Sequence, residues 1–364
     1  MNKEMKTGSK KKKVMIVILI ILLLLNIADC VLSVFIYEQN FGKRFTTTDF
    51  VTHVEDFEGL SAERHEFTSD KGQTLVGYTY SRPADTAEPK GVVVIAHGLG
   101  AGHIHYLSAA NRFAENGYLV FAYDATGNDE SEGDGVGGLP QGIIDLDHAI
   151  SCAEELYPEL PVVLFGHSWG GYSIMSVLKY HPEVKAAAEC SGFVSSLDMF
   201  ESEGKNQVGI AIYAMLPYVK LYDYIKFGKY AASGALEGLA ASDTPVMVIH
   251  SADDDVVPIE YGYDKIYEKY GSDPRFEFIR LEDAGHNRVY EDKAAREALN
   301  VKFREWLDTR GYDYEAEENA ERLNTDKDYY MNNVMDRDEW NDTLNDELFE
   351  RITALYDRSI GGGE

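Results

Sequence analysis

Residues 162–171 read VVLFGHSWGG, an apolar run from Val162 to Phe165 followed by a serine with a glycine two positions to either side. The apolar run predicts a strand buried on both faces, and a helical pattern begins at Gly170. A strand that passes into a helix this abruptly leaves no room for side chains at the two glycine positions. The turn therefore exposes the hydroxyl of Ser168 at a helix N-terminus, where backbone N–H groups favour a developing oxyanion. This stretch predicts a serine nucleophile.

Strand and helix patterns alternate on both sides of this stretch. After a hairpin-like pair at 64–69 and 74–81, the predicted strands are 91–96, 118–123, 162–165, 184–190, 246–250 and 276–281, and the predicted helices are 104–115, 139–156, 170–180, 260–269 and 292–309. Strands that alternate with helices form parallel sheets with helices on both faces. The sequence therefore predicts a doubly wound α/β fold with a mostly parallel sheet.

Two segments interrupt the alternation. Residues 200–242 are rich in apolar and tyrosine residues and lie between two predicted strands, which is typical of a small inserted cap. Some of these side chains are expected to line an acyl-binding pocket, with Met215 and Tyr218 as candidates. Residues 311–364 form a strongly acidic extension, in which one amphipathic helix is predicted at 342–356, packed on the domain.

A serine nucleophile needs a histidine base and a carboxylate that orients it. Three histidines follow Ser168, namely His181, His250 and His286. The order in sheets of this kind is serine, acid, histidine. His286 follows the last predicted strand and is the only histidine downstream of the aspartates at 253–255, which end the strand before it. The chemistry of three adjacent carboxylates does not distinguish among them.

Four ordered motifs carry a resemblance to a known family. They are HGLG at 97–100, DATGNDESEGD at 124–134, GHSWG at 166–170 and AGH at 284–286. Together they resemble the α/β-hydrolase superfamily, specifically its monoglyceride lipase and serine aminopeptidase branch, over about residues 64–309. Asp129 departs from the pattern, since a glycine is usual there, and this change leaves the proposed triad untouched.

The resemblance implies roles for individual residues. In this family the acid stands four residues before a proline, which selects Asp254 over the runner-up Asp253, and His97 is implied to hold its loop in place. The implied catalytic triad is Ser168, Asp254 and His286, and the implied oxyanion hole is the backbone N–H groups of Leu99 and Trp169.

The expected activity is that of a serine hydrolase that cleaves carboxylic esters of lipid-like or medium-chain acids through an acyl-enzyme. Three alternatives stay open. A serine peptidase or aminopeptidase acting on short peptides would need a carboxylate in the cap, for which Glu201 or Glu203 is available. An acyltransferase would differ only in excluding water. An inactive membrane-bound binding module is disfavoured by the intact triad. The oligomeric state is not predicted.

Residues 14–37 predict a transmembrane signal anchor. The apolar run from Val14 to Leu25 would rise only about 18 Å as a helix, whereas extension to Tyr37 gives about 36 Å, enough for a hydrocarbon core of about 30 Å. Asp29 costs roughly 2.5–3.5 kcal/mol, and the many Leu, Ile and Val residues, each worth roughly 0.3–0.6 kcal/mol, outweigh it. The lysines of the basic segment 1–13 predict a cytoplasmic N-terminus, so the hydrolase domain at 38–310 is expected outside. A cleaved signal peptide is the alternative.

Charge and composition exclude several other classes. Beyond residue 37 the chain carries 28 basic and 60 acidic residues, a net charge of −32, which disfavours binding to nucleic acid. The three cysteines have no metal-ligand spacing, and Cys152 and Cys190 are expected to be thiols rather than a disulfide. His103 and His105 are not expected to hold a metal. The glycine-rich stretch 133–142 lacks the residues of a phosphate loop, so no cofactor is expected.

Overall fold

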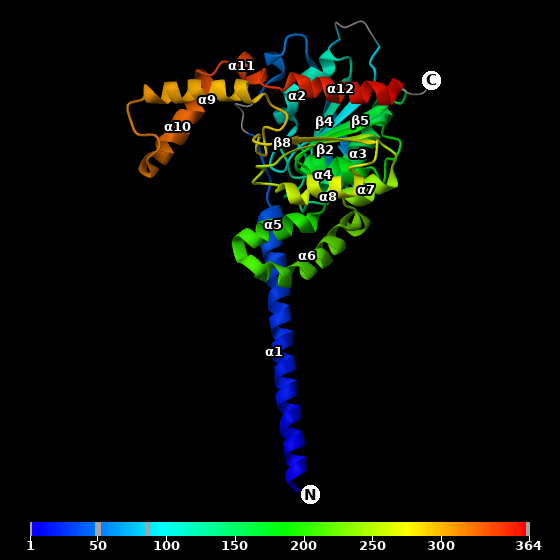
Figure 1. The fold of residues 1–364 in the computed structure, drawn as a ribbon, viewed down its shortest axis with the longest axis vertical. Coiled ribbons are helices and arrows are strands. Elements are labelled where there is room, and N and C mark those ends of the chain that lie inside the picture. The colour runs from blue at the N-terminus through cyan, green and yellow to red at the C-terminus, as the bar shows by residue number, and fades with distance from the viewer. Residues whose placement is uncertain (1, 48–51, 84–87, 362–364) are drawn as a thin grey trace.

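The computed structural model describes residues 2–47, 52–83 and 88–361, and its centre is a single eight-stranded sheet (Figure 1). The strand order is β1-β2-β4-β3-β5-β6-β7-β8, with β2 antiparallel to both of its neighbours and all other pairs parallel. The mostly parallel sheet predicted from the sequence is thus confirmed. The strands are β1 (Ser61–Thr68), β2 (Thr74–Ser81), β3 (Val92–Ala96), β4 (Leu119–Asp124), β5 (Val162–His167), β6 (Ala187–Cys190), β7 (Val246–Ser251) and β8 (Phe276–Leu281).

Helices cover both faces of the sheet (Figure 1). One face packs against α3 (Gln141–Leu156), α4 (Trp169–Val177), α7 (Ala235–Ala241) and α8 (Tyr263–Tyr270). The other face packs against α2 (Leu107–Glu115) and the C-terminal helix α12 (Asp346–Gly361). Because both faces are covered, β3, β5 and β7 are buried along their whole length, which explains the apolar runs at 92–96, 162–165 and 246–249.

The inserted cap consists mainly of two helices, α5 (Ser196–Val208) and α6 (Ile212–Phe227). The cap was expected at about 200–242, and this boundary needs correction at its C-terminal end. Ala235 and Leu239 of α7 are buried in the core against the sheet, because a short helix of small apolar residues packs closely on α4. The segment at α7 therefore belongs to the helical layer of the domain.

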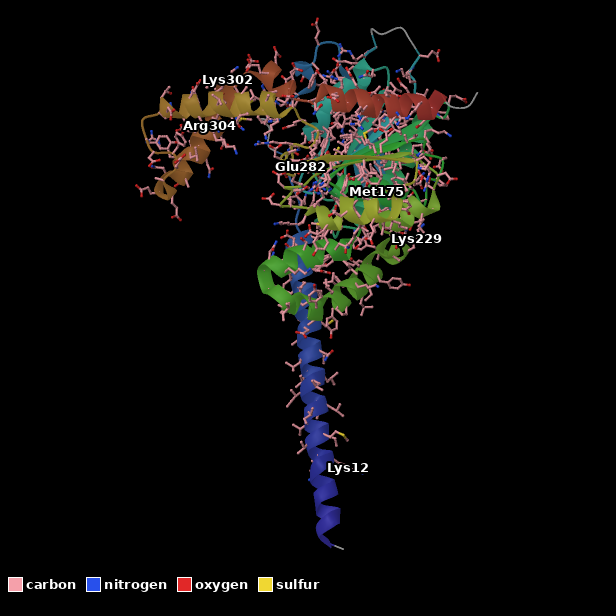
Figure 2. All side chains as sticks on the ribbon, viewed as in Figure 1. Lys12, Met175, Lys229, Glu282, Lys302 and Arg304 are labelled. Atoms are coloured by element: carbon pink, nitrogen blue, oxygen red, sulfur yellow. The ribbon has the colours of Figure 1, made fainter. Side chains whose placement is uncertain are left out.

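The N-terminal helix α1 (Asn2–Phe41) extends away from the domain as a single rod (Figure 1). Its stretch Lys12–Phe41 contains an 18-residue window with a mean hydropathy of 3.0 and is, by length and composition, apolar enough to cross a membrane. Side chains on the part of this rod below the cap stand free of the rest of the chain, as around Lys12 in Figure 2. The helix runs beyond the predicted end at residue 37, and its last turns are covered, with Tyr37 and Phe41 buried against the cap.

The acidic extension contains three helices, where the sequence predicted one. After α9 (Lys293–Asp308), the chain forms α10 (Ala320–Asn333) and the short α11 (Arg337–Asn341) before α12. Tyr330 of α10 packs on two aromatic rings of α9, Phe303 and Trp306, at centroid distances of 4.9 and 5.2 Å. The acidity of the surrounding sequence obscured this apolar contact. Helix α12 begins later than predicted, and its buried apolar side chains are Leu348, Phe349, Ile352, Leu355 and Tyr356.

Candidate active site

The turn between β5 and α4 holds Ser168 in a strained backbone conformation, with φ 57° and ψ −116°. A Cβ atom at Gly166 would lie 2.5 Å from the carbonyl oxygen of Gly170, and one at Gly170 would overlap the carbonyl oxygen of Ala96. Only glycine fits at these two positions, because the strand and helix approach so closely. The strain is the consequence of a turn that projects the serine hydroxyl from the sheet edge.

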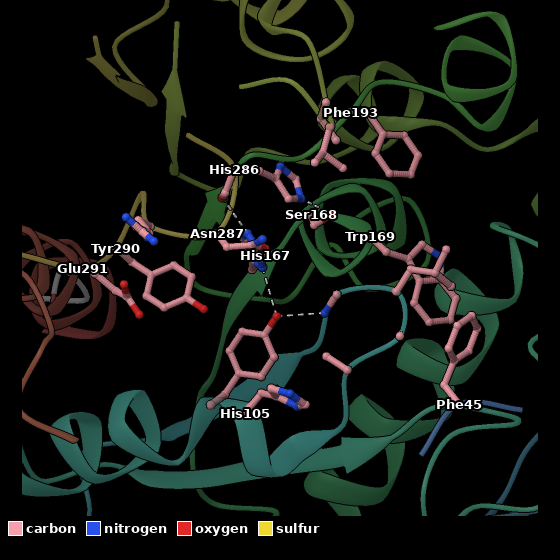
Figure 3. Close-up of a pocket in the computed structure, with 18 of the residues that line it drawn as sticks. Phe45, His105, His167, Ser168, Trp169, Phe193, His286, Asn287, Tyr290 and Glu291 are labelled. Carbon is pink, nitrogen blue, oxygen red and sulfur yellow. Dashed lines mark hydrogen bonds between the residues drawn. The ribbon is translucent and has the colours of Figure 1, made fainter. Parts of the chain in front are cut away.

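Ser168, His286 and Asp254 form one chain of hydrogen bonds (Figure 3 shows the first two). The Oγ of Ser168 lies 2.9 Å from Nε2 of His286, and Nδ1 of His286 lies 2.8 Å from Oδ2 of Asp254. Both the histidine and the aspartate are buried, at 7% and 5% exposure. With its proton on Nδ1, the imidazole donates to the aspartate and can accept the serine proton on Nε2.

The three adjacent aspartates have different environments. Asp254 is the buried one, and its Oδ1 accepts hydrogen bonds from the backbone N–H groups of Val256 and Val257 at 3.0 and 2.8 Å. Asp253 is exposed and turns toward the histidine loop, where it accepts from the backbone N–H of Gly285 at 2.8 Å. Asp255 is exposed. The geometry thus brings Asp254 to His286 and gives Asp253 a role in shaping the loop that carries it.

Hydrogen bonds keep the carboxylate of Asp254 ionised. Burial alone would raise its pKa, but the hydrogen bonds from His250 and His286 hold the pKa well below its usual range. The Nε2 of His250 lies 2.9 Å from the carbonyl oxygen of Val257 and 3.3 Å from Oδ2 of Asp254. Glu189, on the neighbouring strand β6, is fully buried, and burial raises its pKa to about 7. A fixed negative charge beside His286 is therefore available at neutral pH.

A second histidine, His167, precedes Ser168 in the chain and contacts the loop that carries His286. The sequence had not pointed to this residue. The backbone N–H of Gly98 donates to the hydroxyl of Tyr106 at 2.9 Å, and that hydroxyl lies 3.0 Å from Nδ1 of His167. The Nε2 of His167 lies 3.0 Å from the carbonyl oxygen of His286. These contacts, drawn in Figure 3, need a neutral imidazole that accepts at Nδ1 and donates at Nε2.

The pKa of His167 agrees with this assignment, since burial, and then the neighbouring His286, lower it to about 3. The GxSxG motif predicted a role for its serine only. His167 could have been predicted from its position, because it is the last residue of a buried strand and stands next to Ser168. His167 thus links the loop that begins at Gly98 with the loop that carries His286.

The two implied oxyanion donors, Leu99 and Trp169, line the same cavity as Ser168. The loop of Leu99 is held by His97, whose Nε2 accepts from the backbone N–H of Ala125 at 2.9 Å and whose Nδ1 lies 2.8 Å from the carbonyl oxygen of Gly98. Burial lowers the pKa of His97, which is consistent with a neutral, structural imidazole. Leu99 and Trp169 flank the nucleophile from two different elements, the loop after β3 and the start of α4.

The cavity above Ser168 measures about 1060 Å³. Its walls come from four parts of the chain: the nucleophile and histidine loops, the cap, the last turns of α1 and the C-terminal helices. The cap contributes Met199, Phe200, Glu203, Gly204, Gln207 and Ile212. Aromatic and apolar residues of α9 to α11, such as Phe303, Tyr330, Met331 and Trp340, form a further wall.

The expectation that Met215 and Tyr218 line the pocket is wrong. Met215 is buried within the cap, and the hydroxyl of Tyr218 donates to Oδ1 of Asn26 on α1 at 2.7 Å. Neither residue lines the cavity, because α6 packs along α1 and these side chains are used in that packing and within the cap. Glu203 lines the cavity, whereas Glu201 is held by Lys205 at 2.6 Å and by the hydroxyl of Tyr213 at 3.1 Å.

Other histidines at possible metal sites already have hydrogen-bond partners within the chain. His103 lies 2.8 Å from the buried carboxylate of Asp124, and His105 contacts the backbone N–H of Gly102. In the part of the chain that the structure describes, the one group with metal-ligand spacing is Glu154, His181 and Glu183. There His181 is already bonded to Asp147 and Glu183 at 2.8 and 2.7 Å. All three cysteines are free thiols.

Comparison with known proteins agrees with the fold and the motifs. The family model for serine aminopeptidases (S33) matches residues 87–221, a range that includes Ser168. The monoacylglycerol lipase of Mycolicibacterium smegmatis is 33% identical over 132 residues, which are 35% of this chain and 45% of that protein. The monoglyceride lipase of Rattus norvegicus is 35% identical over 94 residues, 25% of this chain and 30% of that one. The chain thus spans less than half the length of these curated relatives.

A solved esterase from Pyrococcus furiosus superposes with a TM-score of 0.53 at 18% identity, and the match covers 74% of this chain and 98% of the esterase. This likeness concerns the fold. Fold, ordered motifs and family match agree with one another. Together these findings support a relationship to the α/β-hydrolase superfamily, and the proteins that this chain is similar to are its monoglyceride lipases and serine aminopeptidases.

Proposed function

We propose that this protein is a membrane-anchored serine hydrolase that cleaves carboxylic esters with lipid-like or medium-chain acyl groups. The observation that carries the proposal is the hydrogen-bonded chain from Ser168 through His286 to Asp254, at the floor of a large cavity. A weakly nucleophilic hydroxyl becomes reactive when a base within hydrogen-bond distance removes its proton.

This geometry supports the following reaction. Oγ of Ser168 attacks the acyl carbonyl as its proton moves to Nε2 of His286, and Asp254 stabilises the resulting imidazolium. The backbone N–H groups of Leu99 and Trp169 donate to the oxyanion of the tetrahedral intermediate. When the intermediate collapses, His286 returns the proton to the departing alcohol and an acyl-enzyme remains. Water, deprotonated by His286, then attacks the ester carbonyl and releases the acid and the serine.

The cavity walls support an apolar acyl group. Met199, Phe200 and Ile212 of the cap line the cavity together with Leu139 and Phe193 of the domain. Each CH₂ group of a substrate that leaves water for such a surface contributes about 0.8 kcal/mol. The named relatives include lipases that act on monoacylglycerols, and the proposal extends this substrate class to the present chain as the esters of an apolar acid.

We further propose that α1 is an uncleaved anchor with the N-terminus in the cytoplasm and the hydrolase domain outside. The lysines that precede the apolar run support this orientation. The burial of Tyr37 and Phe41 shows that the last turns of α1 pack on the cap as part of the folded domain.

The proposed activity is tested with a fluorophosphonate probe on the full-length chain. The unmodified protein should be labelled at Ser168 and should hydrolyse 4-nitrophenyl esters, and Ser168→Ala should lose both properties. Ser173→Ala is the matched control, since that serine lies one turn further along α4 and donates only to the carbonyl oxygen of Trp169. Undiminished labelling of Ser168→Ala would overturn the assignment.

A peptidase is the second candidate, because one cap carboxylate, Glu203, lines the cavity and is suited to binding a substrate amine. Comparison of an octanoyl ester with an aminoacyl amide distinguishes the two activities. Faster cleavage of the amide, lost on Glu203→Gln, would favour the peptidase.

A further inference from the structure

The helix that anchors the chain also forms part of the wall of the active-site cavity. Ile36, Asn40 and Phe41, in the last turns of α1, line the cavity that contains Ser168. Phe41 is buried, Ile36 is half-buried and Asn40 is exposed, so Asn40 stands at a mouth of the cavity. The cap contributes Glu203, Gln207 and Ile212 to the same cavity, of which Glu203 and Gln207 are exposed and Ile212 is buried.

A buried polar contact fixes α1 to the cap. Tyr37 is fully buried, and its hydroxyl donates to Oδ1 of Asp223 on α6 at 2.5 Å. The other carboxylate oxygen of Asp223 accepts from the hydroxyl of Ser196 on α5 at 2.8 Å. The ring of Tyr37 also stacks on Phe200, with centroids 5.2 Å apart. One tyrosine of the anchor thereby holds both cap helices.

A second contact lies one residue further along α1. Oε1 of Glu38 accepts hydrogen bonds from the hydroxyl of Tyr222 at 2.8 Å and from Nζ of Lys226 at 2.7 Å, both on α6. Together with the contact between Tyr218 and Asn26, these bonds hold α6 along α1. The level of the cap relative to a membrane is therefore set by how deeply α1 inserts.

The length of α1 determines that level. If the hydrocarbon core begins after Lys13, a thickness of about 30 Å ends about 20 residues later, at Ser33. Ser33 is also the first fully buried side chain of α1 among residues 12–41. Ile36 and Asn40 then lie roughly 5–10 Å above the hydrocarbon, a distance comparable to the thickness of the headgroup layer.

The exposed surface of the cap fits such a position. Large apolar or tyrosine side chains stand exposed on and beside α6, among them Ile210 at 88%, Ile225 at 69% and Tyr224 at 62%. Helix α6 contains two lysines and one acid, Asp223, which is buried, although the chain beyond residue 37 has a net charge of −32. Tyrosine, lysine and apolar residues together are typical of a helix at a membrane interface. Figure 1 places α6 on the side of the domain from which α1 extends.

We propose that the cavity opens toward the outer leaflet beside α1, so that a membrane-resident acyl ester reaches Ser168 between Ile36 and Asn40 of the anchor and Gln207 and Ile212 of the cap. This proposal rests on the proposed hydrolase activity and on α1 as a membrane anchor. It goes further by naming the bilayer as the place from which the substrate comes. In this arrangement the anchor is a substrate-positioning element, and the ester enters directly from the bilayer.

The first test narrows this mouth in the full-length chain reconstituted into phosphatidylcholine vesicles. Two substrates are compared, 4-nitrophenyl palmitate carried in the vesicles and 4-nitrophenyl butyrate in solution. Asn40→Trp should lower kcat/KM for the vesicle-borne ester about fivefold more than for the soluble one. Gln39→Trp is the matched control, because Gln39 is exposed on the same turn and does not line the cavity. If Asn40→Trp lowers kcat/KM for both esters by the same factor, as Gln39→Trp is expected to do, the proposed route is overturned.

The second test measures depth and does not depend on activity. On a Cys30→Ser, Cys152→Ser background, a fluorophore on Ile225→Cys should be quenched by lipids with a nitroxide near the headgroup, and one on Tyr329→Cys of α10 should not. An unquenched Ile225→Cys label would overturn the bilayer contact. If the unmodified chain neither reacts with a fluorophosphonate nor cleaves either ester, the hydrolase proposal and the substrate route fall together. A quenched label would in that case still support the position of the cap at the bilayer.

Discussion

At the scale of single residues, the site depends on which charged forms its neighbours can adopt. Asp254 is held ionised by hydrogen bonds, whereas His167, in contact with the histidine loop, is held neutral by burial. In the proposed reaction His286 becomes an imidazolium, and a second positive charge beside it would oppose that change. The ionised Asp254 and the neutral His167 would therefore both favour protonation of His286 in the proposed transition state.

The choice between neighbouring aspartates can be tested directly. Asp254→Asn should lower kcat by about 10⁴, because an amide stabilises the wrong tautomer of the imidazole and carries no charge. Asp253→Asn should have a much smaller effect, since its contacts are with Ser251 and the backbone of Gly285. Steady-state kinetics on a soluble ester measure both. A loss for Asp253→Asn that equals the loss for Asp254→Asn would contradict the assignment.

The buried neutral His167 predicts a pH dependence of stability. Its pKa is about 3 in the folded chain and about 6.5 when unfolded, so between these values the unfolded state binds the proton and stability falls as the pH falls. From pH 7 to pH 5 this histidine should cost about 2 kcal/mol. Urea unfolding in detergent, followed by tryptophan fluorescence, should show this loss in the unmodified chain and a loss smaller by that amount in His167→Gln. Identical pH dependence of the two proteins would exclude the depressed pKa.

At the scale of secondary-structure elements, α12 is a structural part of the domain although it lies at the end of an acidic extension. Its residue Phe349 is fully buried, with ring centroids 5.4 Å from Phe113 on α2 and 6.0 Å from Phe165 on β5. The hydroxyl of Tyr356 donates to the carbonyl oxygen of Leu164 at 2.7 Å. The helix thereby covers the strand that leads to the nucleophile.

Truncation of one side chain measures this packing. Phe349→Ala should lower the free energy of unfolding by about 3–5 kcal/mol, the usual cost of replacing a buried phenylalanine. The adjacent exposed Glu350→Ala should change it by less than about 0.5 kcal/mol. Urea denaturation of both variants measures these changes in the free energy of unfolding. A cost below about 1 kcal/mol for Phe349→Ala would mean that α12 is not integral to the core.

The cap is the element expected to set acyl preference. Soluble esters should gain about fourfold in kcat/KM for each added CH₂ group from acetyl to octanoyl, as far as the apolar wall extends. Met199→Asp, on the cavity wall, should flatten this series, whereas Ile210→Asp, exposed and outside the cavity, should leave it unchanged. A series that is flat in the unmodified enzyme would contradict an acyl-binding cap.

At the scale of the whole molecule, charge and hydropathy are divided along the chain. A lysine-rich start and an apolar run, both within the continuous helix α1, precede the rest of the chain, which has a net charge of −32 beyond residue 37. Anionic headgroups repel most of this acidic surface. Helix α6 differs, because it carries more lysines than acids and lies where the cap contacts α1. In the proposed arrangement, the cavity lies on the membrane side of the domain.

The anchor predicts retention in the membrane after carbonate washing and digestion of the hydrolase domain by protease added to spheroplasts. The double variant Leu19→Lys, Leu22→Lys should be released, because two lysines near the helix centre oppose insertion by roughly 5–7 kcal/mol. Appearance of the unmodified full-length chain in the carbonate supernatant would contradict an integral anchor.

The sequence by itself determined the features that depend on local sterics and periodicity. The elbow at Ser168 could be recognised because a tight strand-to-helix turn tolerates only glycine at two fixed positions. The parallel sheet followed from alternating patterns, and the long apolar N-terminal helix from the length of an apolar run. The position of His286 followed from its order along the chain. Each of these signals lies within a short stretch.

Only the tertiary structure decided which distant groups meet. The neighbours Asp253 and Asp254 have the same chemistry, and the fold buries one beside His286 and leaves the other on the loop. Met215 and Tyr218 have the apolar character of pocket residues, but the packing of α6 on α1 turns them away. Tyr37 lay within the predicted membrane span, and its partner Asp223 is 186 residues further along. Such contacts depend on the packing of whole elements, and no local periodicity encodes them.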